Sequence, residues 1–236
     1  MVNTSKLLIL GSLVLGSLPL SAATLVGYNF DSSGGYSLPN SVAPSTSDPS
    51  VVTGILSLNN GTTQGNTGFL RTTSGPENGT ASLAIQFQNI ENGAAPTDGN
   101  AAPDNVTFSV STNSGQFLQL QSLTFLTGLN ANQTTGAVYT VQYNIGAGFV
   151  NIGSSFTQTA NAAETRTIDL SDPMFSSVSS ISFRINITEP EGSTNDPTFS
   201  ARLDDLVLNG NVIPEPSSLV LLGAAGLLAV GRRSRR

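Results

Sequence analysis

Short runs of alternating apolar and polar residues cover most of the chain between residues 25 and 208. In the clearest run, residues 181–187, apolar side chains occupy every second position and Ser182, Arg184 and Asn186 stand between them. A period of two predicts a strand with one buried face. Such runs, bounded by turn residues, predict nine or ten strands, at residues 25–30, 51–58, 81–87, 106–110, 117–126, 138–144, 149–152, 165–170, 181–187 and 199–208.

Breaks in the alternation predict local irregularities. The pattern shifts by one residue at Gln121 and Ser122, and again at Asp204 and Asp205, while Gly54 interrupts residues 51–58. An extra or small residue within a strand is typical of a β-bulge. Two glycines within residues 145–148 predict a hairpin connection between the strands on either side.

The fold class follows from these runs and from what lies between them. No stretch keeps apolar residues at the spacing of a helix face. Residues 31–50, 61–79 and 90–105 form long, polar connections. We predict an all-β fold, a two-sheet antiparallel β-sandwich in residues 24–211, because a single domain of this kind commonly has that length.

The N-terminal segment, residues 1–23, has the organisation of a signal peptide. Lys6 supplies the positive charge, residues 7–20 are apolar, and Ser21, Ala22 and Ala23 form a small-residue cleavage site for signal peptidase. The alternative is a membrane helix, but the apolar run is short for a hydrocarbon core of roughly 30 Å. A strand-like run also follows it directly.

Residues 212–236 form a second targeting segment. Pro214, Glu215 and Pro216 are followed by an apolar run at residues 219–230, which predicts a single hydrophobic helix. A run of that length is more often a buried core helix than a membrane span. Here, however, it is followed by the cluster Arg232, Arg233, Arg235 and Arg236, which suits retention on the cytoplasmic side of a membrane.

This order of parts closely resembles the PEP-CTERM sorting signal of Gram-negative bacteria. The resemblance implies that Pro214, Glu215 and Pro216 are recognised by an exosortase, a membrane transpeptidase that cleaves its substrates near the motif. It also implies transient anchoring in the inner membrane and delivery to the cell surface or extracellular matrix. As in a lipid-anchor signal, the apolar tail would then be absent from the mature protein.

Composition excludes several classes of function. Residues 24–211 contain four arginines and no lysine against fourteen carboxylates, a net charge of −10, which disfavours binding to nucleic acid. The chain has no cysteine and no histidine, which excludes disulfides, thiolate catalysis and histidine-dependent triads. It also has no tryptophan, the strongest aromatic platform for stacking on sugars.

The predicted β domain resembles jelly-roll domains of the carbohydrate-binding-module and galactose-binding-like type, through residues 26–31, 180–185 and 199–210. The resemblance implies that the first and last strands are neighbours. It also implies a structural calcium site at Asp31, Asp204 and Asp205, completed by main-chain carbonyls or water. The alternative is that these aspartates cap turns or face solvent at a bulge.

Tyrosines are the remaining candidates for sugar contacts, and Tyr28 and Tyr36 are the two that we select. Tyr139 and Tyr143 share a strand face with Val141, so we expect those two rings to be buried.

Catalysis would need a pair of carboxylates, as in glycoside hydrolysis. The available acids lie mostly in Gly-, Pro- and Asn-rich loops, where precise geometry is rarely built; they are Glu77, Glu91, Asp98, Glu164, Glu189 and Glu191. The sequence therefore favours an exported, non-catalytic protein with a structural or adhesive role in an exopolysaccharide layer. A carbohydrate-binding module is the alternative, and a polysaccharide-degrading enzyme is a weaker one.

Overall fold

The computed structural model describes residues 21–29, 41–59, 70–72, 84–88, 104–129, 136–159, 163–190 and 200–215. Most of the predicted signal peptide and the sorting tail from Pro216 onward lie outside these residues. Within the described part of the chain, no helix is long and apolar enough to cross a membrane. The predicted hydrophobic helix at residues 219–230 is not among the residues described.

Strands distant in the sequence form the first sheet, here called sheet A. Its described strands follow the order β13 (Glu164–Asp169), β9 (Gln116–Leu129), β15 (Ser200–Pro214), β1 (Ala23–Tyr28) and β3 (Thr46–Ser47). At one end β7 (Ala84–Gln88) also pairs with β15, and β6 (Leu70–Thr72) pairs with β7. Strands β1 and β15 are antiparallel neighbours, as the jelly-roll resemblance implies.

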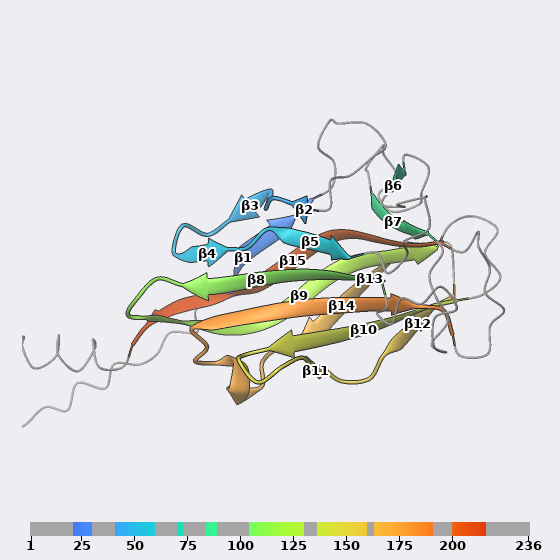
Figure 1. Cartoon of the computed structure of the whole chain (residues 1–236). Coiled ribbons are helices and arrows are strands. Elements are labelled where there is room, and N and C mark those ends of the chain that lie inside the picture. The colour runs from blue at the N-terminus through green and yellow to red at the C-terminus, as the bar shows by residue number, and fades with distance from the viewer. Residues whose placement is uncertain are drawn as a thin grey trace, which may run out of the picture.

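The second sheet, sheet B, lies against sheet A. Its described strands follow the order β11 (Val150–Asn151), β10 (Ala137–Asn144), β14 (Ser180–Thr188), β8 (Asp104–Thr112), β5 (Leu56–Asn59) and β2 (Ser41–Val42). Strand β12 (Phe156–Gln158) pairs with β10, and β4 (Val51–Thr53) pairs with β8. A 3-10 turn, η1 (Pro173–Phe175), precedes β14. Figure 1 shows the two layers, with β8, β14 and β10 in front of β9 and β13.

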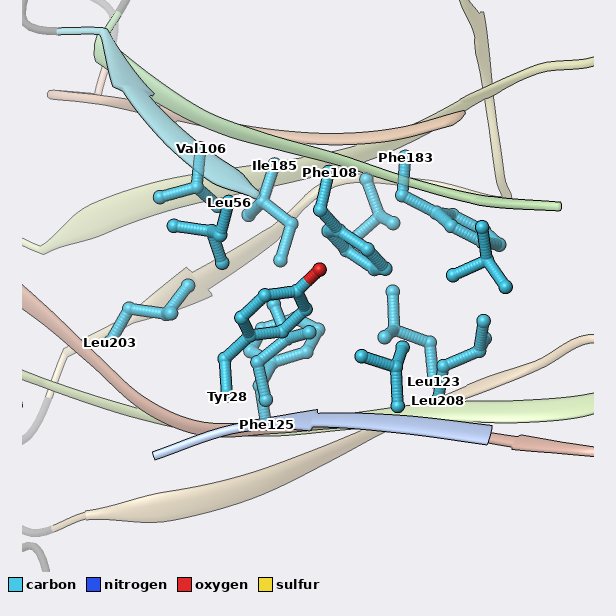
Figure 2. Packing of buried hydrophobic residues seen from close by; sticks show 14 of the residues in the cluster. Tyr28, Leu56, Val106, Phe108, Leu123, Phe125, Phe183, Ile185, Leu203 and Leu208 are labelled. Carbon is cyan, nitrogen blue, oxygen red and sulfur yellow. The ribbon is translucent and has the colours of Figure 1, made fainter. Parts of the chain in front are cut away.

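The core lies between the two sheets. It is filled by the apolar side chains that alternate with polar ones along the strands. Along β14 every second residue from Ile181 to Ile187 is buried. Figure 2 shows Tyr28 and Phe125 of sheet A pointing toward Phe108 and Phe183 of sheet B. The rings of Phe108 and Phe183 stack with centroids 5.3 Å apart, and Tyr28 meets Phe108 edge-on at 5.4 Å. The predicted all-β fold with two antiparallel sheets is confirmed.

The predicted irregularities are present in the described strands. Between β15 and β9, Asn209 pairs with Ser122 but Gly210 pairs with Leu120, so Gln121 is the extra residue. A second shift lies between Asp204 and Val207. The predicted hairpin at residues 145–148 joins β10 to β11 through Gly146 and Gly148, both with positive φ.

Gly54 marks the break that divides one predicted strand into two. Strands β4 and β5 both pair with β8, and the Gly54 N–H donates to the Ser109 carbonyl at 2.7 Å between them. A Cβ atom at residue 54 would lie 2.5 Å from Ser109 Oγ, so the close approach of the two chains requires glycine.

The sequence pattern missed several short strands. Strands β2, β3 and β6 lie in segments predicted as loops, and β12 was not expected. Strand β15 continues past residue 208 and past the predicted domain end at residue 211, to Pro214. Its last residues have little alternation of their own and are held by pairing with β9.

Candidate functional site

A groove of about 560 Å³ crosses the face of sheet A that is turned away from sheet B, here called the outer face. It runs over β13, β9, β15 and β1 to the loop before β3. The described residues that line it are Gly27, Tyr28, Asn29, Ser45, Thr46, Thr124, Phe125, Leu126, Thr165, Asp205 and Val207. Most of these are small and polar, and Leu126 and Val207 supply apolar contact area.

Glycine and a pinned loop shape one end of the groove. A Cβ atom on Gly27 would lie 2.6 Å from Thr46 Oγ1, so the loop can approach β1 this closely because residue 27 has no side chain. Ser45 fastens the loop: its N–H and its hydroxyl donate to the Gly27 carbonyl at 2.9 and 3.0 Å. The Asn29 N–H donates to Ser45 Oγ at 3.0 Å. This wall is therefore fixed before any ligand arrives, which reduces the ordering cost of binding.

The bulge in β15 determines the charge in the groove. Asp205 has φ 45°, the left-handed region that only a few residue types, Asp among them, tolerate. Asp204 is 1% exposed, and its Oδ1 accepts the Asp205 N–H at 2.8 Å. Asp205 lines the groove and is the single charged side chain among the described lining residues. The irregularity thus separates two adjacent carboxylates into two environments.

Tyr28, selected from the sequence as a possible sugar contact, is buried. Although Tyr28 borders the groove, its ring points into the core and is 1% exposed (Figure 2). Its hydroxyl donates to the Gly54 carbonyl at 2.6 Å, and burial raises the pKa of the phenol. Tyr36, the other selected tyrosine, lies outside the described residues.

The expected burial of Tyr139 is confirmed, because its ring is 0% exposed and its hydroxyl donates to the Arg202 carbonyl at 2.9 Å. Tyr143 is half-buried and meets Phe175 edge-on with centroids 5.0 Å apart.

The calcium site stays a prediction. Asp31 lies outside the described residues, and Asp204 and Asp205 differ in environment as stated above. In the part of the chain that the structure describes, His, Cys, Asp and Glu nowhere gather in a group of three or more. Main-chain carbonyls would therefore have to supply a large share of the six to eight oxygens that Ca²⁺ takes.

Pro214, the first residue of the predicted Pro-Glu-Pro motif, is part of the sheet, and Glu215 is hydrogen-bonded directly after it. Pro214 ends β15 and pairs with Gln116 of β9. The Glu215 N–H donates to the carbonyl of Gly115, in the turn between β8 and β9, at 3.0 Å. Pro216 and the cluster Arg232, Arg233, Arg235 and Arg236 lie outside the described residues.

No curated protein matches the chain. Among solved structures, the CBM22-1 xylan-binding domain from Paenibacillus barcinonensis Xyn10C is 11% identical, with 80% of this chain and 96% of that domain covered and a TM-score of 0.40. An adhesin domain of Lys-gingipain from Porphyromonas gingivalis is 15% identical, with 81% and 99% covered and a TM-score of 0.39. The C-terminal domain of a chitobiase from Bacteroides fragilis is 14% identical, with 70% and 96% covered and a TM-score of 0.32. These likenesses establish neither a ligand nor a site in this chain.

The C-terminal segment gives a more specific result. Residues 212–236 match the PEP-CTERM protein-sorting motif, the same residues in which the sequence showed the Pro-Glu-Pro, apolar and arginine-rich parts. The chain therefore carries a PEP-CTERM sorting motif at residues 212–236, which is typical of secreted proteins that are sorted through the membrane to the cell surface.

Proposed function

We propose that this protein is exported from a Gram-negative bacterium, processed by exosortase, and placed at the cell surface or in the extracellular matrix as a non-catalytic component of a polysaccharide layer. Its β domain would bind neutral saccharide chains in the groove on sheet A and so have a structural or adhesive role. The groove is the observation that carries the binding part of the proposal, and the sorting motif supports the export part.

The chemistry of the groove suits a sugar. The hydroxyl groups of Thr124 and Thr165 can exchange hydrogen bonds with sugar hydroxyls, and Leu126 offers an apolar surface for ring C–H groups. A volume of about 560 Å³ is within the usual range for small-molecule sites. Because the described lining offers no exposed aromatic ring for stacking, we expect weak binding at each site. Many copies in one layer would raise the overall strength through multivalency.

The carboxylates favour binding over hydrolysis. Glycosidases generally place two carboxyl groups on either side of the scissile bond. Asp205 is the single carboxylate among the described lining residues. Of the acids considered from the sequence, Glu189 is 1% exposed and Glu164 is ion-paired with Arg166. The others, Glu77, Glu91, Asp98 and Glu191, lie outside the described residues.

Calorimetric titration of the purified protein with a panel of neutral polysaccharides tests the binding part. We expect saturable binding to at least one polymer and its loss in Thr124→Arg, which places a long side chain across the groove. The matched control is Thr157→Arg, at an exposed position on β12 of sheet B, which should bind as the wild type does. No binding across the panel, or equal loss in both variants, would refute the assignment of the groove.

The export part has a separate test. Intact mass and cell fraction are compared between the native host and the same host without exosortase. We expect a mature form beginning near Thr24 and shortened near Pro214, outside the cell only when exosortase is present. A full-length C-terminus in both strains would contradict processing.

A further inference from the structure

The outer face of sheet B carries a row of polar side chains centred on one arginine. The register places Asn151 of β11, Gln142 of β10, Arg184 of β14, Thr107 of β8 and Ser57 of β5 side by side across five strands. Arg184 is the single charged side chain at the outward positions of β8, β10 and β14, all of which the structure describes. The sequence showed only that Arg184 faces away from the core.

The Arg184 guanidinium is held in a fixed position. Its Cζ lies 4.0 Å from the centroid of the Phe149 ring, and its Nε donates to Gln142 Oε1 at 2.8 Å. The same oxygen accepts from Asn186 Nδ2 at 3.0 Å, and Gln142 Nε2 donates to Asn151 Oδ1 at 2.8 Å. Partial burial lowers the pKa of Arg184, although guanidinium remains charged at any physiological pH. A preorganised, partly desolvated cation attracts an anion more strongly than a freely solvated one does.

A second arginine in the same molecule shows what is unusual about Arg184. Arg166 also lies over a phenylalanine ring, that of Phe156, at 4.6 Å, but it is ion-paired with Glu164. Within the described residues no carboxylate is within ion-pair distance of Arg184. The charge of Arg166 is therefore neutralised by a carboxylate of the same chain. The charge of Arg184 stands on a face whose other outward side chains on β8, β10 and β14 are uncharged and mostly carry hydroxyls or amides.

We propose that Arg184, with Gln142, Asn151 and Asn186, forms a site for the carboxylate of a uronic acid residue in an acidic polysaccharide. Arg184 Nε is already used by Gln142, so the terminal Nη groups would donate to the carboxylate oxygens, the geometry in which arginine is most selective. The amides beside it would hydrogen-bond the neighbouring sugar hydroxyls. This site lies on the opposite side of the sandwich from the groove, so one molecule could hold an acidic chain on one face and a neutral chain on the other.

Calorimetry with sodium polygalacturonate tests the site, using the full chain. Wild type should bind saturably, with weaker binding as salt rises. Arg184→Gln should weaken binding at least tenfold, and Arg184→Lys should recover part of it, because lysine keeps the charge but not the planar fork. Arg166→Gln, the matched control, should bind as the wild type does.

The methyl-esterified polymer is the second probe, because it has the same chain without the charge. We expect it to bind poorly. Equal binding of the two polymers, or equal effects of Arg184→Gln and Arg166→Gln, would overturn the proposal. Thermal unfolding of each variant separates lost binding from lost folding. If Arg184→Gln proves to be unfolded, the binding of Arg184→Lys is used to test the proposal instead. The groove variant Thr124→Arg acts on the other face, so the two proposals can fail independently.

A different observation carries a second inference, which rests on processing by exosortase. The sorting motif begins inside the folded sheet: Ile213 and Pro214 pair with Phe117 and Gln116, and Glu215 is bonded to Gly115. Only residues 216–218 separate Glu215 from the apolar run that begins at Leu219. An extended chain spans at most about 3.6 Å per residue, so Leu219 lies at most about 14 Å along the chain from Glu215.

This arrangement obstructs an enzyme that acts at the motif. Enzymes and receptors that take an extended peptide commonly engage its main-chain N–H and C=O groups. At the end of β15, residues 212–214 pair with β9, so the main-chain groups on that side of the strand are already hydrogen-bonded. We infer that exosortase acts only when the last residues of β15, from Val212 to Pro214, separate from β9 and Glu215 separates from Gly115, so that pairing of this strand end limits processing.

An engineered disulfide across the strand end tests this inference in the native host. The chain has no cysteine of its own, and the compartment outside the inner membrane is oxidising. Directly paired antiparallel residues have Cα atoms about 4.5–5.5 Å apart, within the range of a disulfide. Phe117→Cys with Ile213→Cys joins the end of β15 to β9, and Ser122→Cys with Asn209→Cys, on the same two strands, is the control.

We expect processing to fall several-fold in the first pair, to recover on reduction, and to be unchanged in the control pair. Equal processing of both pairs, with the disulfides shown to be closed by thiol titration, would overturn the inference. If the first disulfide does not form, the rate of processing of the Ile213→Gly variant tests the inference instead. Glycine weakens strand pairing, so processing should be faster, and an unchanged rate would also overturn it.

Discussion

The hydroxyl of Tyr28 gives the sharpest test of the core. Tyr28→Phe removes one oxygen and leaves the ring where it is, between the sheets and edge-on to Phe108. The oxygen is the donor in a hydrogen bond of 2.6 Å to the Gly54 carbonyl. Gly54 in turn lies at the break between β4 and β5, so the bond joins β1 of sheet A to an edge of sheet B.

The expected cost follows from two contributions. A neutral hydrogen bond contributes a net of about 0.5–1.5 kcal/mol, and leaving a buried acceptor without its partner costs about 1–3 kcal/mol. The Gly54 carbonyl is partly buried, so water can replace some of the loss. We therefore expect the free energy of unfolding to fall by about 1.5 kcal/mol, which is roughly a tenfold change in the folding equilibrium.

Urea unfolding at pH 7 measures this change. The midpoint should fall while the slope with denaturant stays constant, since the exposed surface does not change. Tyr143→Phe is the matched control: Tyr143 is half-buried, and its hydroxyl contacts only Met174 Sδ, at 3.7 Å, in the described part of the chain. It should cost less than about 0.5 kcal/mol. Equal losses in the two variants, or no loss in Tyr28→Phe, would refute the reasoning.

Three further predictions concern pH and the backbone. Burial raises the pKa of Tyr28 above its unfolded value of about 10, so its contribution to stability is complete below pH 10 and is lost as pH rises further; unfolding followed from pH 9 to 11 should show a steeper loss in wild type than in Tyr28→Phe. Gly54→Ala should lower the free energy of unfolding by about 1–3 kcal/mol, because a Cβ atom there would lie 2.5 Å from Ser109 Oγ and 3.2 Å from its carbonyl, and a thermal shift measures the loss. Hydrogen bonds from Ser171 lower the pKa of Asp169, so the carboxylate stabilises the fold above its unfolded pKa of about 3.9 and this is lost as pH falls through the folded pKa. Carbon NMR titration should show the Asp169 pKa rising in Ser171→Ala, and an unchanged value would contradict this cause.

The sequence alone determined the elements whose pattern is local. In a strand with one buried face, apolar and polar residues alternate along the sequence. For this reason β14 was predicted within one residue at each end. The bulges at Gln121 and Asp205 were predictable for the same reason, because an extra residue shifts that period within a few positions. The sorting motif is likewise a local pattern, because its Pro-Glu-Pro, apolar and arginine-rich parts follow one another directly in the sequence.

Pairing between distant strands decided what the sequence left open. Tyr28 lies within the predicted strand at residues 25–30, and the residue pattern alone did not say which face of that strand is buried, whereas pairing of β1 with β15 turns the ring into the core. The final residues of β15 have little alternation of apolar and polar positions, and their conformation comes from pairing with residues 116–118 of β9, which lie 94 to 98 positions earlier in the chain. Local preference could not indicate either outcome.

Both candidate binding faces are products of that tertiary pairing. The groove combines residues of β1, β9, β13 and β15, and the position of Asp205 within it depends on a bulge whose direction only the sheet fixes. Arg184 was assigned an outward position from sequence, but Phe149 and Gln142, which hold it, come from a neighbouring hairpin. The alternation of apolar and polar residues along a strand indicates which face of that strand is buried. Which side chains become neighbours across the sheet depends on register, and register is set by packing of the whole core.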